Sequence, residues 1–237
     1  MYASLYQILT HGLQWDIPYY QKYAQEFGSP ILELGAGLGR IALPLVAEGH
    51  QVHCLDISSE MCATLEHSKA HLPSSQQELL EITCGDMSDY ALPASKFGLA
   101  IIALRSFQLL SLEQQEKCLV QTRSHLHDGA ALVMHISSFN IAKADAVWRF
   151  ATEHPTEDGT LHIDECLCHN ATRNSFVLRH RITQYNAQSQ WIGSWNTRHE
   201  LYKVELQDLR QSLAEAGFSD MRVEELPSGD SLVIAIV

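Results

Sequence analysis

The 237-residue sequence predicts an α/β fold: a doubly wound, mostly parallel seven-stranded sheet with helices on both faces. Three observations support this prediction. Short apolar runs alternate with helical periods between residues 30 and 136. A cluster of three glycines follows the first apolar run, as in the ligand-binding turns of such sheets. Residues 160–203 then change to alternating polar and aromatic side chains, which indicates a small antiparallel insertion.

The first half of the chain consists of repeated strand–helix units. A strand over 30–34 leads through the glycines to a helix over 38–47, which Pro44 is expected to kink. A second strand over 51–55 completes a βαβ unit, whose strands run parallel. The alternation then continues with a helix over 60–70, strands over 79–84 and 97–103, a helix over 112–126 and a strand over 130–135.

The second half of the chain begins with the insertion. Three antiparallel strands are expected over 161–168, 175–185 and 191–202. A helix over 205–215 and strands over 221–225 and 231–237 then close the fold. We therefore expect N-terminal helices over 1–28, followed by one domain over 29–237 with a three-stranded insertion at about 158–204.

Composition restricts the class of partner. The chain carries 28 acidic and 16 basic residues, a net charge of −12, which disfavours nucleic acid as a ligand. The basic triplet Arg179, His180 and Arg181 is interpreted as a solvated strand face. Neither a signal peptide nor a membrane-spanning apolar run is found, so we expect a cytoplasmic protein, monomeric or homodimeric, that acts on a small molecule.

The glycine turn indicates the kind of cofactor. Gly35, Gly37 and Gly39 give the pattern G-x-G-x-G, whereas a dinucleotide site would place its third glycine at the position of Arg40. Asp56 ends the second strand, where a carboxylate accepts hydrogen bonds from the two hydroxyls of a ribose. Asp86 ends the third strand. These residues predict an adenosine-containing cofactor without a pyrophosphate on the helix.

The motifs E-L-G-A-G-L-G-R, L-D-I-S-S-E-M, C-G-D-M, L-R-S-F-Q-L-L and L-A-E-A-G-F extend over most of the chain. In this combination the sequence resembles the class I S-adenosylmethionine-dependent methyltransferases, in their small-molecule branch. The resemblance implies S-adenosylmethionine as cofactor, S-adenosylhomocysteine as product, and an antiparallel flap over the active site. The implied cofactor residues are Glu33, Gly35, Ala36, Gly37, Gly39, Arg40, Asp56, Ile57, Met61, Gly85, Asp86, Met87, Leu104 and Arg105.

The substrate side is less closely defined by the sequence. The aromatic residues near the N-terminus resemble the lid helices of the family, and each ring is equally well explained by hydrophobic packing. The candidate substrate-binding residues are Tyr6, Trp15, Tyr19, Tyr20, Phe107, Gln108 and Trp195. Arg105 follows an apolar strand and is expected either to hold a carboxylate in the pocket or to pair with Glu33.

Transfer to a nitrogen or oxygen nucleophile requires a base only where the nucleophile must lose a proton. Some relatives carry a histidine where this chain has Leu109. His135, at the end of the fifth strand, is the alternative, and a structural role explains it equally well.

The sequence leaves two other functions and one metal site to compare with methyl transfer. A nicotinamide-dependent oxidoreductase is disfavoured by Arg40, and a non-catalytic cofactor-binding protein by the intact motifs. His162, Asp164, Cys166 and Cys168 share one strand face, but side chains two residues apart on a single strand diverge too far for one zinc ion, so we expect no metal site.

Overall fold

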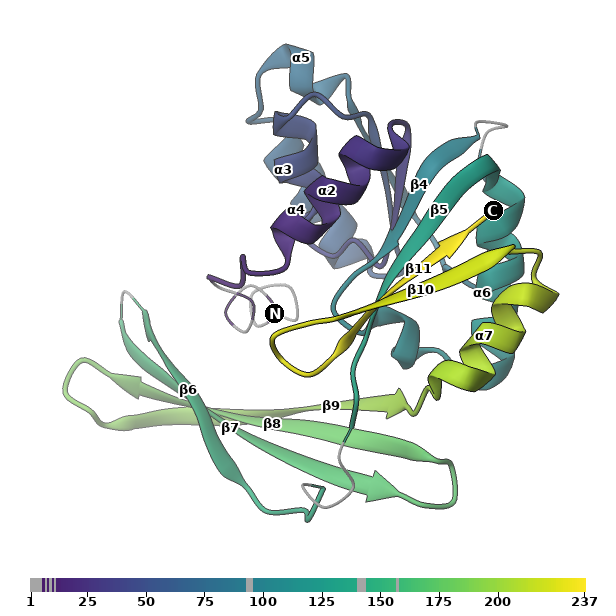
Figure 1. Cartoon of the computed structure of the whole chain (residues 1–237). Coiled ribbons are helices and arrows are strands. Elements are labelled where there is room, and N and C mark those ends of the chain that lie inside the picture. Colours follow the sequence, from purple (N-terminus) through teal and green to yellow (C-terminus); the bar gives the residue numbers. More distant parts are fainter. Residues whose placement is uncertain are drawn as a thin grey trace. The chain divides into compact units, whose positions relative to one another are not determined.

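The computed structural model describes residues 6, 8, 10, 12–92, 96–139, 144–156 and 158–237 (Figure 1). Two compact units make up the chain: residues 1–137 together with 204–237, and residues 138–203. Each is described by itself. No helix in the described ranges has both the length and the apolar character needed to cross a membrane.

The larger unit is built on the predicted seven-stranded sheet. Strands β1 to β5 run parallel, and β11 and β10 extend the sheet with antiparallel pairings. Their order across the sheet is β10-β11-β5-β4-β1-β2-β3. The chain adds β2 and β3 on one side of β1 and then β4 and β5 on the other side, so the order changes direction beside β1. The strands are β1 Ile31–Leu34, β2 Val52–Asp56, β3 Leu80–Cys84, β4 Phe97–Ile102, β5 Leu126–Ile136, β10 Asp220–Glu225 and β11 Ser231–Ile236.

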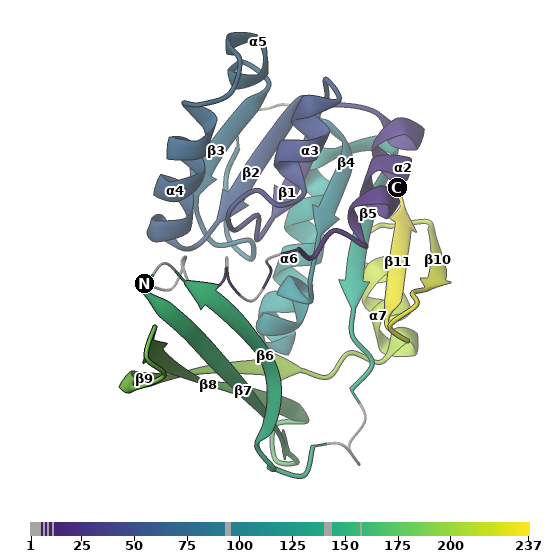
Figure 2. The same ribbon diagram turned by 90° about the vertical axis from the view of Figure 1, so that its left-hand side faces the viewer.

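Helices cover both faces of this sheet, as predicted (Figure 2). Side chains alternate along each strand, so Leu32 and Leu34 enter the core beneath α6 and α7, whereas Ile31 enters the core beneath α2 and α3. The helices are α2 Ile17–Phe27, α3 Ala42–Ala47, α4 Ser59–Lys69, α5 Ser74–Gln77, the 3₁₀ helix η1 Ser106–Leu109, α6 Leu112–His125 and α7 Leu206–Glu215.

The helix after the glycine turn is shorter than the sequence predicted. It was expected over 38–47 with a kink at Pro44, but α3 begins at Ala42. Gly37 and Gly39 adopt φ of 56° and 77°, so the intervening residues belong to a turn rather than to a helix. Pro44 therefore lies in the first turn of α3, where its missing N–H breaks no helical hydrogen bond and no kink is needed.

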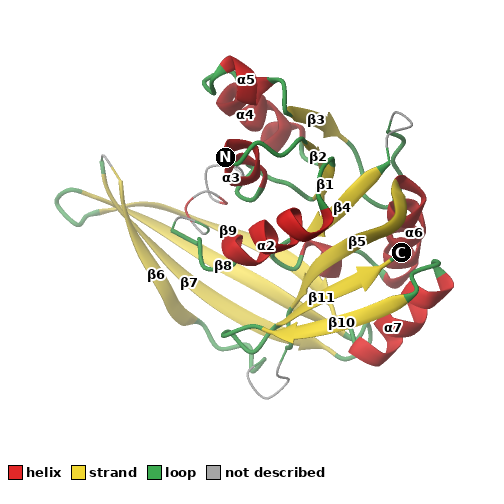
Figure 3. Cartoon of the chain, turned by 45° about the horizontal axis from the view of Figure 1, so that its top comes forward, coloured by secondary structure: helices red, strands yellow, loops and turns green. Residues whose placement is uncertain are grey.

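The smaller unit is a four-stranded antiparallel sheet, not the predicted three-stranded one (Figure 3). It consists of β6 Arg149–Thr156, β7 Gly159–Asn170, β8 Ser175–Asn186 and β9 Trp191–Tyr202. The missed strand is β6, which forms one edge of the sheet and is largely exposed. It therefore lacks the buried alternation that marks a strand in sequence, and it contains Pro155, which is tolerated at a sheet edge.

The polar side chains of this second sheet contact one another across its strands. Arg181, from the basic triplet, donates to Asp164 at 2.8 Å and lies over the ring of Trp148. His162 lies 3.1 Å from Glu153. Two of the four side chains weighed as zinc ligands are thus engaged with neighbours of their own sheet.

Candidate functional site

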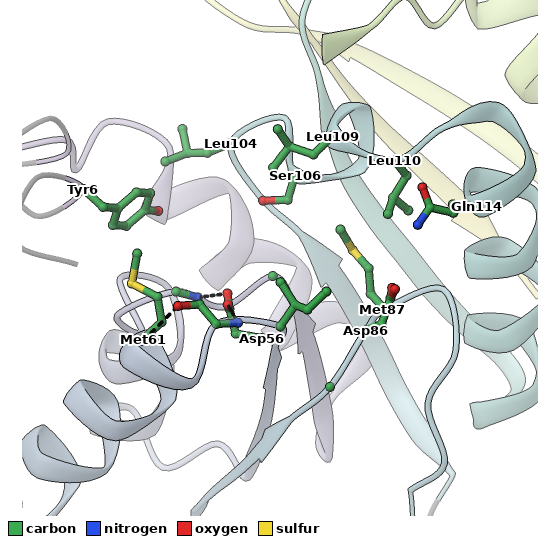
Figure 4. A pocket seen from close by; sticks show the side chains of 15 residues that line it. Tyr6, Asp56, Met61, Asp86, Met87, Leu104, Ser106, Leu109, Leu110 and Gln114 are labelled. Carbon is green, nitrogen blue, oxygen red and sulfur yellow. Dashed lines mark hydrogen bonds between the residues drawn. The ribbon is translucent and has the colours of Figure 1, made fainter. Parts of the chain in front are cut away.

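A pocket of about 350 Å³ lies at the carboxyl ends of β1 to β4 (Figure 4). Ligands of open α/β sheets bind at this edge, and here it also carries the glycine turn. The lining residues are Tyr6, Gly35, Gly37, Asp56, Ile57, Ser58, Met61, Gly85, Asp86, Met87, Leu104, Ser106, Leu109, Leu110 and Gln114.

The three glycines of the turn are needed for different structural reasons. A Cβ on Gly35 would lie 3.0 Å from Cβ of Ser106, and one on Gly37 would lie 3.4 Å from the ring of Tyr6. Both positions keep the pocket wall thin and have positive φ. Gly39 does not line the pocket; its Cβ would lie 2.5 Å from Cδ1 of Leu65 on α4, so this glycine serves packing against the helix.

Asp56 is held in one orientation at the floor of the pocket. Its Oδ2 accepts a hydrogen bond from the Gly37 N–H at 2.8 Å, and its Oδ1 accepts one from the Ser58 N–H at 2.9 Å (Figure 4). Ser58 also caps α4 by accepting from the Met61 N–H. Each carboxylate oxygen has the capacity to accept two hydrogen bonds and here accepts one, so both oxygens retain one acceptor position for a ligand hydroxyl.

The end of the pocket near β3 combines an apolar slot with a second carboxylate. Ile57 is 71% exposed although it is apolar, and it lines the pocket together with Met87 and Leu110. A flat apolar ring would cover such surface. Asp86 accepts two 2.8 Å hydrogen bonds at Oδ1, from the backbone and the hydroxyl of Ser88. This arrangement leaves Oδ2 as the acceptor for a ligand amino group.

Glu33 lies under the glycine turn and does not line the pocket. Its side chain is 2% exposed, and burial raises the pKa of its carboxyl to about 8, partly opposed by Arg40 and by the Ala42 N–H, which donates to it. Its Oε2 has no hydrogen-bond partner in the described part of the chain. Below that pKa the carboxyl is protonated, so Glu33 is a neutral group at neutral pH.

Arg40 is predicted from the motif as a cofactor residue, but the structure places it outside the pocket lining. Its guanidinium forms a bidentate ion pair with Asp16, at 2.5 Å and 2.7 Å, and donates to the Leu13 carbonyl at 3.0 Å. The two side chains are 12% and 2% exposed. Arg40 therefore anchors the segment before α2 to the glycine turn, and it also hydrogen-bonds Tyr6, whose pKa burial raises.

The structure separates the predicted substrate residues. Tyr6 lines the pocket, whereas Phe107 is fully buried in the core beneath α6. Gln108 is 0% exposed and joins η1 to the end of β5: its Nε2 donates to the Ser137 carbonyl and its Oε1 accepts from the Ser137 N–H. Tyr20 is buried and Tyr19 half-buried against the α2 core. Trp195 belongs to the smaller unit, and its role stays a prediction.

Arg105 is not among the pocket-lining residues, although both of its neighbours, Leu104 and Ser106, are. It adopts φ of 68° and is half-buried, and the described residues provide it with no ion pair, from Glu33 or otherwise. That its side chain holds a carboxylate in the pocket stays a prediction. Ala36 is likewise buried in the core rather than in the lining.

His135 is buried at the end of β5, with its Nε2 3.0 Å from Oδ2 of Asp230. The ring of Trp15 meets it edge-on at a centroid distance of 6.1 Å. Asp230 and Asp16 are the polar partners that the sequence did not reveal, because both contacts join segments far apart in the chain. Five pocket-lining residues were also missed: Ser58, Ser106, Leu109, Leu110 and Gln114. Of these, Ser58 had a sequence signal, because a serine directly before a helix is a preferred N-cap.

Residues 31–129 match the family described as "Methyltransferase domain". This segment, which makes up less than half of the chain, is similar to methyltransferase domains. No curated protein matches the chain by sequence. The structure of CalS10 with bound S-adenosylmethionine, an amino pentose methyltransferase from Micromonospora echinaspora involved in calicheamicin biosynthesis, superimposes with a TM-score of 0.78 at 18% identity, covering 99% of this chain and 95% of that one.

Two further solved structures share the fold of this chain. DesVI from Streptomyces venezuelae gives a TM-score of 0.78 at 19% identity, covering 100% of this chain and 98% of that chain. The CcbJ methyltransferase from Streptomyces caelestis gives 0.77 at 19% identity, covering 94% and 90%. The likeness therefore extends beyond residues 31–129 to nearly the whole chain, and the fold is the Rossmann-like one of these methyltransferases.

Proposed function

We propose that this protein transfers the methyl group of S-adenosylmethionine to a nitrogen or oxygen atom of a small-molecule acceptor, releasing S-adenosylhomocysteine. One observation carries the proposal: Asp56, fixed by two backbone N–H groups, opens onto the same 350 Å³ pocket as the glycine turn and an apolar slot that ends in a carboxylate. A ribose, a methionine chain and an adenine need these three environments.

The residues present fit this cofactor part by part. The free acceptor positions of Asp56 suit the two ribose hydroxyls. The slot of Ile57, Met87 and Leu110 suits the adenine ring, with Asp86 Oδ2 toward its amino group. Gly35 and Gly37 let the methionine part approach the backbone, and Glu33 supports the turn from below.

Methyl transfer from a sulfonium is an in-line displacement with a neutral leaving group. The cofactor supplies the activated methyl, so the protein contributes mainly alignment and exclusion of water. Tyr6 contacts the glycine turn, and the Arg40–Asp16 pair holds the following segment close to it. We assign these N-terminal residues the role of a lid on the cofactor.

The proposal also includes the chemical type of the methyl acceptor. CalS10 is described as an amino pentose methyltransferase, and an amine of a small polar molecule is accordingly the acceptor we propose first, with a hydroxyl as the alternative. We further propose a cytoplasmic enzyme, monomeric or homodimeric.

Turnover tests this function directly. The protein is incubated with S-adenosylmethionine carrying a labelled methyl group and with pools of amino sugars, amines and hydroxylated metabolites, and labelled products are identified by mass spectrometry. Labelled product that requires the protein supports the proposal. Binding of NADH in place of S-adenosylmethionine would instead support the oxidoreductase alternative, and cofactor binding without any transfer would support a non-catalytic role.

A further inference from the structure

The end of β5 carries two buried polar atoms that the cofactor pocket does not use. Nδ1 of His135 and Oγ of Ser137 each have no hydrogen-bond partner in the described part of the chain. Ser137 directly follows Ile136, the last residue of β5, and one residue separates it from His135, so the alternation of the strand end places their two side chains on the same side. Leaving a buried polar atom unpaired costs about 1–3 kcal/mol, so two on one side indicate a place prepared for a polar ligand group.

His135 and Ser137 lie at the edge of the sheet where the carboxyl ends of the parallel strands meet the pocket. Ile102 of β4 pairs with Met134 of β5, so the next residue along, His135, lies beside Ala103, directly before the pocket residue Leu104. In the same way, Glu33 pairs with Ile101, which places Gly35 on the other side of Ala103. Two strand spacings, about 10 Å, thus separate the backbones of His135 and Gly35.

The contact with Asp230 fixes the state of the His135 ring. Oδ2 of Asp230 lies 3.0 Å from Nε2, and a carboxylate only accepts, so Nε2 carries the hydrogen and Nδ1 holds the lone pair. The carboxylate also stabilises the imidazolium that forms when Nδ1 takes up a proton. Gln108 holds the strand end in place through its two hydrogen bonds to the backbone of Ser137.

Three other ionisable groups of the described residues near this side of the sheet each have a charge partner or a raised pKa. From the segment packed over the strand come Asp16 and Tyr20; Asp16 is bound by Arg40, and burial raises the pKa of Tyr20. From β1 comes Glu33, protonated at neutral pH because burial raises its pKa to about 8. Asp230 is therefore the carboxylate that acts on His135, while Trp15 borders its ring.

We propose that His135, oriented by Asp230, is the proton acceptor of the methyl transfer, and that Ser137 Oγ hydrogen-bonds the same acceptor group. The inference rests on the proposed function. The acceptor nitrogen forms a bond to the methyl carbon, the carbon–sulfur bond breaks with its electron pair going to sulfur, and the proton lost by the nitrogen goes to Nδ1. The imidazolium then releases that proton to water.

The test compares His135→Gln, whose amide still donates to Asp230 but takes up no proton, with Asp230→Asn. His127→Gln is the matched control, because His127 is an exposed histidine on the same strand. Two measurements are made on each full-length variant: calorimetric affinity for S-adenosylhomocysteine, and kcat/KM against pH for methyl-label transfer to D-glucosamine and to a deproteinised metabolite extract.

We expect His135→Gln to keep the S-adenosylhomocysteine affinity within about twofold and to lose roughly 100-fold or more in kcat/KM near neutral pH. Its remaining activity should rise about tenfold per pH unit as the acceptor loses its proton to solvent, and free imidazole should restore part of the rate. Asp230→Asn should lose roughly tenfold or more, and His127→Gln should match the wild type.

Several results would overturn the assignment. A His135→Gln profile that is lowered equally at every pH and is not rescued by imidazole would show a structural role. If the wild-type protein binds S-adenosylhomocysteine but transfers no label to either probe, the assignment of His135 as proton acceptor is also overturned, because no proton transfer then takes place. Failure of S-adenosylhomocysteine binding in the wild type would instead refute the proposed function itself. If His135→Gln does not fold, Asp230→Asn and the pH profile of the wild type decide.

Discussion

Replacing Glu33 by glutamine removes an ionisable group from beneath the glycine turn while keeping its shape. The carboxyl is fully buried, burial raises its pKa from 4.5 to about 8, and Oε2 has no partner in the described part of the chain. Glutamine keeps an oxygen that accepts from the Ala42 N–H. The substitution therefore changes mainly how stability depends on pH.

The size and sign of that dependence follow from the two pKa values. Below pH 4.5 Glu33 is protonated in both the folded and the unfolded chain, so it contributes no difference. Above pH 4.5 the unfolded chain ionises while the folded chain stays protonated until about pH 8. Each pH unit in this window lowers the wild-type unfolding free energy by about 1.4 kcal/mol, so the loss reaches about 3 kcal/mol by pH 7 and levels off above pH 8.

Guanidinium unfolding of wild type and Glu33→Gln at several pH values between 4.5 and 8.5 measures how the unfolding free energy depends on pH. Relative to the wild type, Glu33→Gln should become steadily more stable with rising pH, by about 3 kcal/mol between the acid end and pH 7. Glu78→Gln, at an exposed helix end, is the control and should follow the wild type at every pH. Parallel curves for wild type and Glu33→Gln would refute a buried, protonated Glu33.

Three other substitutions test separate parts of the structure. Asp16→Asn leaves Arg40 buried without its charge partner and should cost about 3 kcal/mol, seen as a Tm lower by roughly 6–12 °C in calorimetry; an unchanged Tm would contradict the anchoring role. Gly39→Ala should cost about 2–4 kcal/mol in guanidinium unfolding, because its Cβ meets Leu65 at 2.5 Å in addition to the positive φ. Gly49→Ala, with positive φ and nothing within 4 Å, should cost about 1 kcal/mol, and equal costs for the two would refute the packing argument.

Much of the fold was predictable because the periodicity of the chain is regular where the sheet is buried. β4 reads as an unbroken apolar run since helices cover both of its faces, and β9 was predicted over its observed range because its side chains alternate. β6 was missed because an exposed edge strand has no buried face to produce such a pattern. The start of α3 was misplaced because Leu38 and Ile41 are apolar for packing within a turn, which periodicity alone does not distinguish from a helix.

The residues of the candidate site also divide into those that the sequence predicts and those that it does not. Asp56, Gly35 and Asp86 were predictable, because each is fixed by its place at a strand end and strand ends meet at one edge of the sheet. Arg40 and Gln108 were assigned to ligands in sequence, but the structure engages both in long-range contacts, with Asp16 and with the backbone of Ser137. A polar residue beside a motif carries no local signal of such a partner.

The central claim is that the pocket at the strand ends binds S-adenosylmethionine through Asp56. Isothermal titration of the protein with S-adenosylhomocysteine, for wild type and Asp56→Ala with Asp128→Ala as the exposed control, tests it most directly. The structure predicts one site per chain in the wild type and in Asp128→Ala, and an affinity lower by roughly 100-fold in Asp56→Ala, from two charge-assisted hydrogen bonds lost. No binding by the wild type, or equal affinity in Asp56→Ala, would contradict the claim.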